Sequence, residues 1–346
     1  MNKILVIQTA FIGDVVLATG IIEKLHAYLP DAQIDFLLRK GNEGLLVGHP
    51  FLHEVLIWDK KKDKLRNLVR MGRKIRKARY DIVINVQRFA ATGLLTFFSG
   101  AGETIGFDKN PLSRWFARRI PHIVSTSEAP LHEIARNQEL IRHITDAEPA
   151  RPRLYPSTAD YEKVRAYKNT PYITISPASV WFTKQYPKEK WVDFIRKVPG
   201  EYTVYLLGGP GDKELCEYIR ERIAGGGKAE TTGGPAVADL SGQFSFLQSA
   251  ALMQDAHMNY TNDSAPMHFA SALNAPVTAI YCSTVPAFGF GPLSDKRYIV
   301  EVEEVLDCRP CGLHGYKACP LGHFNCAHHI RDEQLLVSLA GQPGSG

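Results

Sequence analysis

The chain has 346 residues, of which 45% are hydrophobic and 22% are charged, and its formal net charge is +5. This length suggests two domains, and the composition is that of a globular protein rather than a disordered one. No apolar run approaches the roughly 20 residues that cross a bilayer, and the N-terminus lacks a signal-peptide pattern, so we expect a cytoplasmic protein.

The first half predicts strands that alternate with helices. Five short apolar segments have the length and composition of buried strands: residues 3–8, 33–38, 55–58, 82–86 and 104–107. After the first of them, apolar residues at helical spacing predict a helix from Val15 to Tyr28, and Pro30 ends it. A long helix is expected over Glu128–Thr145. Such alternation predicts a parallel, doubly wound sheet.

The second half repeats this pattern after a linker. Residues 146–171 contain Pro149, Pro152 and Pro156, which favour an interdomain connection, with a short helix at 159–167. Strands are then expected at 172–176, 202–207, 257–260 and 277–281. Helices are expected at 188–198, 212–224 and 246–253, with a Gly-rich turn after Ala224. Two successive α/β halves are the simplest interpretation.

The segment Thr261–Pro276 has the features of a ligand site. It begins with Thr-Asn-Asp-Ser directly after a strand, continues as a helix of about ten residues, and stops at Pro276. Loops at the carboxyl ends of parallel strands bind ligands, and the N–H groups and dipole of a helix N-terminus favour a diphosphate. The same pattern also fits a helix that Asp263 or Ser264 merely caps.

Two further loops could contact phosphates. Lys184 follows a strand and precedes a helix that begins near Pro187, where a lysine can neutralise charge on a leaving phosphate; a solvated lysine is the alternative. The turn Gly208–Asp212 is glycine-rich but lacks the dinucleotide fingerprint, and a plain tight turn fits it equally well. The first strand's turn also lacks that fingerprint, which argues against a dehydrogenase.

Three motifs together resemble a known family. They are Gly13-Asp14 within TAFIGDVVLATG, Ser176-Pro-Ala-Ser with Lys184 and Tyr186-Pro187, and Asn262-Asp-Ser-Ala-Pro-Met-His268. In this order they resemble the signature segments of the bacterial ADP-heptose:lipopolysaccharide heptosyltransferases, glycosyltransferase family 9. The resemblance covers nearly the whole chain, and the cysteine-rich tail is similar to the heptosyltransferase II branch.

The resemblance implies a fold and a reaction. The fold would be α/β of the GT-B type, with two Rossmann-like doubly wound parallel-sheet domains facing across a cleft. Residues 1–155 would bind the acceptor and residues 156–346 the nucleotide sugar. The reaction would be an inverting transfer from an ADP-activated sugar to a lipopolysaccharide inner-core hydroxyl, with no cofactor or metal required. A relative that uses another nucleotide sugar, or a non-catalytic nucleotide-sugar-binding protein, remains an alternative.

The resemblance also implies residue roles. Asp14 would be the general base that takes the proton of the attacking hydroxyl, although a helix-capping Asp fits the same position. Lys184 would act on the leaving diphosphate. The donor-binding residues would be Ser176, Ser179, Lys184, Gln248, Asp263, Ser264, Ala265 and His268. Two positions depart from the family: Ala265 replaces a common glycine, and Leu247-Gln248 replaces a glutamate expected to hold the ribose.

A basic run lies in the first half. Between Lys60 and Arg79 there are eleven Lys or Arg residues and one Asp. An anionic lipopolysaccharide core acceptor suits such a segment, and so does peripheral contact with the cytoplasmic face of the inner membrane. We assign acceptor binding to Gly13, Arg73 and Arg88, with a solvated helix as the alternative. Nucleic acid is rejected, because no aromatic interleaving or nucleic-acid-binding fold accompanies the run.

Four cysteines cluster near the C-terminus. Cys308, Cys311, Cys319 and Cys326 supply enough soft ligands for a structural zinc ion, although their spacing is not the usual pair of C-x2-C motifs. Reduced thiols that pack a small loop are an alternative, and disulfides are a third.

Overall fold

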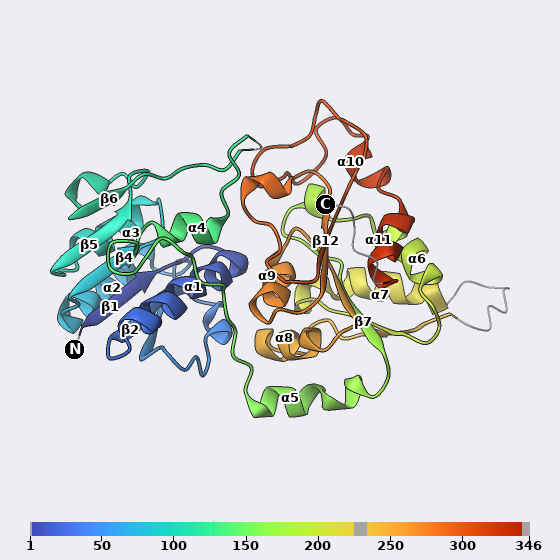
Figure 1. The fold of residues 1–346 in the computed structure, drawn as a ribbon, viewed down its shortest axis with the longest axis horizontal. Helices are drawn as coiled ribbons and strands as arrows, with labels where there is room; N and C mark the ends of the chain where they lie inside the picture. Colours follow the sequence, from blue (N-terminus) through green and yellow to red (C-terminus); the bar gives the residue numbers. More distant parts are fainter. Residues whose placement is uncertain (1, 127, 225–233, 341–346) are drawn as a thin grey trace. The chain divides into compact units, whose positions relative to one another are not determined.

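The computed structural model describes residues 2–126, 128–224 and 234–340. The chain divides into two compact units, Met1–Tyr155 and Pro156–Gly346, and each unit contains one six-stranded parallel sheet flanked by helices (Figure 1). The prediction of two α/β halves is therefore confirmed. The Gly-rich turn predicted after Ala224 falls largely on residues 225–233, outside the described residues.

The sheet of the first unit has the strand order β3-β2-β1-β4-β5-β6. Its strands are β1 Lys3–Ile7, β2 Gln33–Arg39, β3 Glu54–Trp58, β4 Ile82–Asn85, β5 Glu103–Phe107 and β6 Arg118–Ile120. Its helices are α1 Ile12–Tyr28, α2 Lys64–Ala78, α3 Ala90–Phe97 and α4 Glu133–Gln138, with 3-10 turns η1 Glu43–Leu45 and η2 Ser113–Trp115. The central strands are apolar and buried, as expected for a sheet covered on both faces.

The sheet of the second unit has the order β12-β11-β10-β7-β8-β9. Its strands are β7 Tyr172–Ser176, β8 Thr203–Leu206, β9 Ala236–Asp239, β10 Met258–Asn262, β11 Val277–Tyr281 and β12 Arg297–Glu301. Its helices are α5 Thr158–Val164, α6 Lys188–Lys197, α7 Lys213–Ala224, α8 Phe246–Gln254, α9 Ala265–Ala272, α10 Asn325–His328 and α11 Asp332–Leu339. Its 3-10 turns are η3 Arg165–Lys168, η4 Phe182–Lys184, η5 Pro210–Asp212 and η6 Pro286–Phe288.

Aromatic side chains form much of the second core. Trp191, Phe194 and Tyr260 are almost fully buried, and their rings pack edge-on or tilted between α6 and the sheet. Tyr186 packs on Trp191 at a ring distance of 5.1 Å. The loop that carries Lys184 therefore runs directly into the core at Tyr186, which fixes its position.

The helix predicted over Glu128–Thr145 is wrong in length. Only α4 is α-helical there; His132 caps it by accepting a hydrogen bond from the Ile134 N–H. After Gln138 the backbone turns more tightly, and the Gln138 side chain donates to the carbonyl oxygen of Asp146. A side chain that satisfies the backbone of a turn competes with further helix.

Residues 146–155, predicted as linker, lie along α1 of the first unit. Lys24 pairs with Asp146 at 2.6 Å, the Arg153 N–H donates to the Thr19 hydroxyl at 2.8 Å, and the Tyr155 hydroxyl contacts both oxygens of Glu23 at 3.0 Å. Glycine at position 20 of α1 allows this close packing, because a Cβ there would lie 2.6 Å from a carbonyl oxygen of this segment.

Candidate functional site

The second unit places its candidate site where the strand order reverses. β10 and β7 are neighbours in the sheet, but the strand that follows β7 lies on one side of this pair and the strand that follows β10 lies on the other. Open α/β sheets bind ligands at such a point. The buried Asn262 side chain joins the two strand ends: its Nδ2 donates to the carbonyl of Pro177 at 2.8 Å, and its Oδ1 accepts from the N–H of Tyr186 at 2.9 Å. Asn262 thereby fixes the two loops that carry Lys184 and Asp263.

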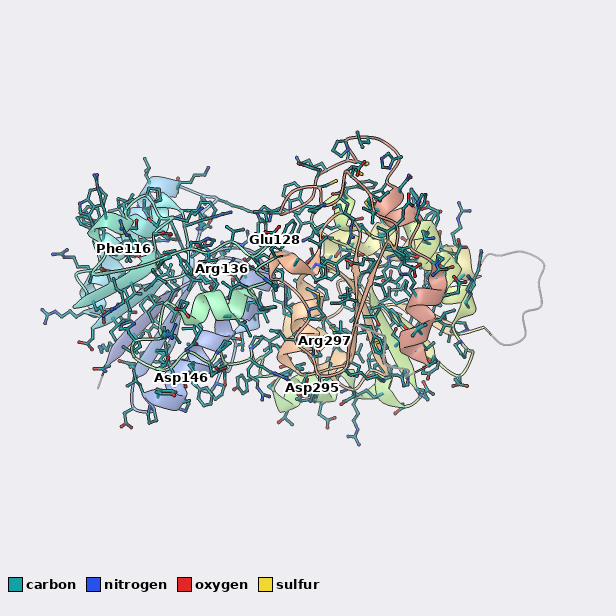
Figure 2. The ribbon with its side chains drawn as sticks, turned by 45° about the horizontal axis from the view of Figure 1, so that its top comes forward. Phe116, Glu128, Arg136, Asp146, Asp295 and Arg297 are labelled. Atoms are coloured by element: carbon teal, nitrogen blue, oxygen red, sulfur yellow. The ribbon has the colours of Figure 1, made fainter. Side chains whose placement is uncertain are left out.

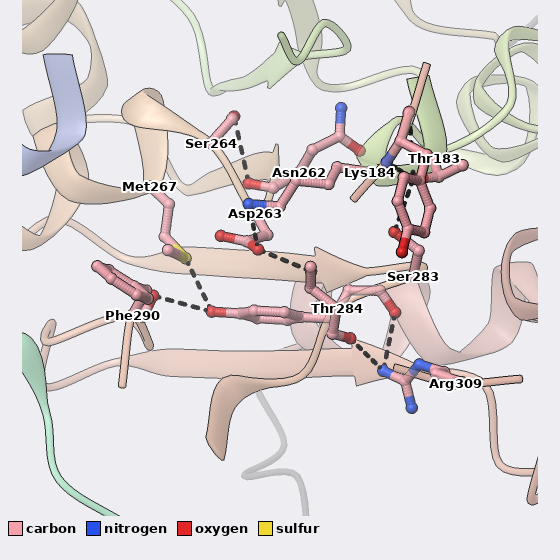
Figure 3. A network of polar contacts seen from close by, with 12 residues as sticks. Thr183, Lys184, Asn262, Asp263, Ser264, Met267, Ser283, Thr284, Phe290 and Arg309 are labelled. Carbon is pink, nitrogen blue, oxygen red and sulfur yellow. Dashed lines mark hydrogen bonds and ion pairs between the residues drawn. The ribbon is translucent and has the colours of Figure 1, made fainter. Parts of the chain in front are cut away.

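Lys184 and Asp263 form a largely buried ion pair. Lys184 Nζ lies 2.6 Å from Asp263 Oδ2, and the two side chains are 15% and 9% exposed. The Thr284 hydroxyl donates to the same Oδ2 atom at 2.7 Å (Figure 3). The carboxylate therefore holds the ammonium group at the carboxyl edge of the sheet, so the alternative of a freely solvated Lys184 does not hold.

The N-terminus of α9 lies directly after this pair. Ser264 is the N-cap residue, but its hydroxyl makes no cap hydrogen bond to the first turn and instead donates to the carbonyl of Asn262 at 3.3 Å. Ser264 therefore occupies the N-cap position, but its side chain does not supply the cap hydrogen bond. Ala265 is the first residue of α9. The dipole of this helix brings partial positive charge to the edge of the sheet where Lys184 lies. This arrangement suits a diphosphate.

The other predicted donor residues differ in their surroundings. Ser176 ends β7 and is buried, and its hydroxyl oxygen has no hydrogen-bond partner among the described residues, as expected for a group that faces a ligand. Ser179 contributes its carbonyl to the side chain of Gln185 at 2.7 Å. His268 is buried within α9. Gln248 completes a capping box at the start of α8, where its Oε1 accepts from the Ser245 N–H at 3.1 Å.

The glycine-rich turn at Gly208–Asp212 is a helix start. The Gly209 N–H donates to Asp212 Oδ2 at 2.7 Å, so a carboxylate stands where a phosphate would have to bind. Of the two interpretations that the sequence left open, a phosphate-binding turn and a plain tight turn, the structure favours the plain tight turn.

In the first unit, Asp14 sits in the first turn of α1. Phe11 is the N-cap residue, and its N–H donates to Asp14 Oδ2 at 3.2 Å, so the carboxylate has a capping role at the third helical position rather than at the cap itself. Gly13 precedes it in the same turn. This turn follows the carboxyl end of β1, beside β4, at the point where the strand order of the first sheet reverses.

Arg136 on α4 is a charged group that the sequence motifs missed (Figure 2). It is buried, pairs closely with Glu133, and donates to the Ile123 carbonyl at 3.0 Å. Burial lowers its pKa, the positive charge of Arg88 lowers it further, and the carboxylate of Asp14 raises it. The charge of Arg136 is therefore repelled by the charge of Arg88 and attracted by the carboxylate of Asp14. Arg136 lies 122 positions from Asp14 in the chain (136 − 14), so no local pattern could reveal this grouping.

Lys60 has different surroundings from the exposed basic residues of α2. Its Nζ donates to the hydroxyl of Thr9, just after β1, at 2.7 Å. The same Nζ lies 4.8 Å from the centre of the Trp58 ring. Burial, followed by the charge of Arg39, lowers the pKa of Lys60 to about 8. This lysine belongs to the edge of the sheet near the Asp14 turn rather than to the exposed helix.

Arg73 lies instead on the outer surface of α2. It lines a shallow groove of about 450 Å³ with Leu65, Arg66, Val69 and Arg70, all of them exposed. Arg73 lies on α2, whereas Gly13 and Asp14 lie in the first turn of α1 and Arg88 follows β4. The predicted acceptor-binding residues therefore belong to two places, the Asp14 turn and the α2 groove.

The structure does not support the predicted zinc site. Within the described ranges, no three His, Cys, Asp or Glu side chains form a group that could hold a metal ion, and the described cysteines are free thiols. Cys326 is buried in the apolar core, and the Cys311 thiol is directed at the carbonyl oxygen of Cys308 at 3.2 Å. Burial raises the pKa of Cys326 to about 12, as for a thiol packed among apolar side chains. Reduced thiols that pack a loop fit best.

Across the described residues, no helix is both long enough and apolar enough to pass through a bilayer.

Comparisons with known proteins agree with this geometry. The sequence profile of glycosyltransferase family 9 (heptosyltransferase) matches residues 68–313. Lipopolysaccharide heptosyltransferase 1 of Campylobacter coli is 22% identical over 350 residues, which cover 96% of this chain and 97% of that protein.

Solved structures extend the similarity to the fold. A family 9 glycosyl transferase from Veillonella parvula superposes with a TM-score of 0.80 at 21% identity, covering 99% of this chain and 98% of that one. The ADP-heptose lps heptosyltransferase II of E. coli gives 0.76 at 22% identity, covering 98% and 97%. The predicted GT-B type of fold is confirmed. Because the family profile spans most of the sequence, the chain belongs to glycosyltransferase family 9, the heptosyltransferase family, and is a glycosyltransferase.

Proposed function

We propose that this glycosyltransferase transfers a heptose from ADP-heptose to a hydroxyl of a lipopolysaccharide inner-core sugar, with inversion at the anomeric carbon. The observation that carries the proposal is the Lys184 ammonium group held by Asp263 beside the N-terminus of α9. Both features favour a diphosphate at the carboxyl edge of β7 and β10. The relatives' names support the choice of heptose and of a lipopolysaccharide acceptor.

The chemical step follows from these roles. The acceptor hydroxyl attacks the anomeric carbon, its oxygen forms the new bond, and the bond from that carbon to the diphosphate oxygen breaks. Asp14 accepts the hydroxyl proton, and ADP leaves with the bonding electrons and its added negative charge. Lys184 and the dipole of α9 stabilise that developing charge. Asp263 keeps the lysine in place, because an unpaired ammonium group at 15% exposure would be costly to hold there.

The donor part of the proposal is tested by a nucleotide-sugar panel. The melting temperature is measured with ADP-heptose, GDP-sugars and UDP-sugars at equal concentrations. A ligand that binds only the folded protein raises the free energy of unfolding, by about 2.7 kcal/mol when the ligand concentration is a hundred times its dissociation constant. The melting temperature rises as a result. We expect ADP-heptose to give the largest shift. A larger shift with a GDP- or UDP-sugar would instead support a family 9 enzyme with a different donor.

We further propose that the outer surface of α2 contacts an anionic membrane leaflet, which carries the acceptor. Leu65 is 79% exposed and Val69 is 50% exposed, and arginines flank both. Arg76 on the same helix donates to the carbonyl of Phe98 at 3.4 Å, which brings the end of α3 beside α2. A basic helix with exposed apolar residues binds at anionic lipid interfaces.

An exposed aromatic cluster continues this surface. Phe97 and Phe98 pack edge to face, Phe97 lies 5.7 Å from the ring of Trp115, and Arg114 stacks 3.9 Å over that ring. The three aromatic side chains are 43%, 54% and 47% exposed. Aromatic residues with a cationic neighbour are typical of membrane interfaces.

Vesicle co-sedimentation tests this contact. We expect the protein to bind phosphatidylglycerol vesicles at low salt and phosphatidylcholine vesicles far less, because binding needs both the attraction of the arginines to anionic headgroups and the burial of apolar side chains in the interface. The double variant Leu65→Ser, Val69→Ser should lose binding. Val305→Ser removes an apolar residue that is 92% exposed in the other unit, and should bind as the wild type does. Equal loss in both variants would refute the assignment to α2.

A further inference from the structure

The loop that carries Lys184 is bonded to a distant part of the chain, the segment Arg309–Tyr316. We propose that this segment is a positioning element for Lys184, and that Arg309 and Gly315 are positioning residues that set the affinity for the donor diphosphate. The inference rests on the proposed function and adds to it the part of the chain that holds the phosphate-binding lysine in place.

The first connection is a set of hydrogen bonds at Thr183. The Thr183 N–H donates to the carbonyl of Tyr316 at 3.1 Å, and the Tyr316 N–H donates to the Thr183 hydroxyl oxygen at 2.7 Å. The Ser283 hydroxyl donates to the same oxygen at 3.0 Å, and the Ser283 carbonyl accepts from the Cys311 N–H at 2.8 Å. Thr183 is 1% exposed and immediately precedes Lys184, so these bonds fix the backbone from which the lysine projects.

Gly315 allows the two segments to approach this closely. Its φ of +73° lies in the left-handed region, and a Cβ there would lie 2.8 Å from Thr183 Oγ1 and 3.1 Å from Lys184 Cγ. The added carbon would also lie 3.2 Å from Ser283 Oγ. A side chain at this position would therefore press directly on the stem of the lysine.

The second connection is the guanidinium group of Arg309. Its Nε donates to the Cys282 carbonyl at 2.8 Å, and its Nη2 donates to the carbonyls of Tyr281 at 3.2 Å and Thr284 at 2.8 Å. Glu301 pairs with it at 2.8 Å, and the side chain is 11% exposed. Figure 3 shows the contact between Arg309 and Thr284. One planar side chain thus satisfies three carbonyls at and just after the end of β11.

This second connection also leads to Lys184. Arg309 holds the Thr284 backbone, the Thr284 hydroxyl donates to Asp263 at 2.7 Å, and Asp263 pairs with Lys184 at 2.6 Å. Thr284 is 1% exposed, so its backbone and its hydroxyl are both enclosed by the protein. Lys184 is therefore fixed twice by the same segment, once through its own backbone and once through its ion-pair partner.

The test compares two glycines of the cysteine-rich segment. Gly322 has a φ of +76°, like Gly315, but a Cβ there would meet no heavy atom of the described residues within 4 Å. Gly315→Ala and Gly322→Ala therefore introduce the same backbone strain, and only the first one presses on Lys184. Arg309→Lys is a second variant, because lysine keeps the charge beside Glu301 but has one nitrogen in place of the planar fork, so it cannot reproduce the contacts made from both Nε and Nη2.

We expect Gly315→Ala and Arg309→Lys each to raise the KM for the ADP-sugar donor, and the Kd for ADP, by about tenfold, because both act on ligand binding. The KM for the acceptor should stay unchanged, and Gly322→Ala should match the wild type in all three constants. A role in folding alone would lower the melting temperature without separating donor from acceptor constants.

Two results are decisive. Donor constants within twofold of wild type for both Gly315→Ala and Arg309→Lys would overturn the positioning role. Donor constants in Gly322→Ala that rise as much as in Gly315→Ala would do the same. A wild-type enzyme that neither binds ADP nor turns over an ADP-sugar would instead refute the proposed function, whatever the variants show.

Discussion

At the scale of single residues, Lys184 and Asp263 depend on each other. The shared Oδ2 atom accepts from Thr284 and pairs with Lys184, so the carboxylate acts as a fixed support for the ammonium group. Hydrogen bonds to charged groups contribute about 1.5–3 kcal/mol each. Removing the lysine should therefore weaken binding of the diphosphate and leave the binding of the nucleoside intact.

Lys184→Ala tests this at one position. We expect the Kd for ADP to rise by about tenfold to a hundredfold, which corresponds to the loss of one charged contact, while the Kd for adenosine stays constant. Lys188→Ala is the matched control, since Lys188 begins α6 shortly after the same loop but lies 4.0 Å over the ring of Tyr218. Calorimetric titration measures both constants. Equal weakening of ADP and adenosine would show that the variant disturbs the fold rather than the phosphate contact.

At the scale of elements, the packing of the 146–155 segment on α1 contains a buried histidine. His49 Nε2 lies 3.5 Å from Glu23 and the ring packs edge-on against Tyr155 at 4.8 Å. Burial, followed by the charge of His26, lowers the pKa of His49 to about 4. Between pH 6.5 and 4 the unfolded chain therefore binds a proton that the folded protein does not, and stability falls as the pH falls.

His49→Gln should make the first unit less sensitive to acid. The histidine accounts for at most about 3 kcal/mol of lost unfolding free energy between pH 6.5 and 4, because each unit of pKa shift corresponds to about 1.4 kcal/mol. Glu23 has the opposite effect on the pH dependence of stability. Burial raises its pKa, so the folded protein binds a proton more readily there than the unfolded chain does. Urea unfolding at several pH values measures the slope, with the exposed His328→Gln as control. An unchanged slope in His49→Gln would contradict this account.

The same scale shows what sequence patterns can predict. Central strands such as β1 and β10 follow from apolar runs that local periodicity reveals. The edge strands β6 (RRI) and β9 (AVAD) were not predicted, because they are short or polar and become strands through pairing with a neighbour. The edge strand β12 (RYIVE) was also missed, although its three central residues favour a strand.

The candidate site was predictable only in part, for a related physical reason. The motifs around Lys184 and Asp263 are local in sequence, so their strand-to-helix loops could be placed on the sheet. Arg136, Thr284 and Arg309 come from segments far from those motifs, and their contacts arise only when the chain folds. Asp14 was predicted at a helix start, and the structure specifies its place as the third residue of α1.

At the scale of the whole molecule, the two units carry different chemistry on the same kind of scaffold. Each has a six-stranded parallel sheet and a candidate site at the point where the strand order reverses. The first unit supplies a carboxylate with arginines, and the second supplies a lysine with a helix N-terminus. In the proposed reaction the first unit activates the acceptor and the second stabilises the leaving diphosphate.

The most direct test is transfer by wild type and Asp14→Asn, followed by mass spectrometry of a heptose-deficient lipopolysaccharide core incubated with ADP-heptose. Loss of a general base lowers turnover by about a hundredfold to ten-thousandfold. We predict that wild type adds one heptose and releases ADP, and that Asp14→Asn shows a loss of this size with an unchanged Kd for ADP. Near-normal turnover in Asp14→Asn, or no heptose addition by the wild type, would contradict the account.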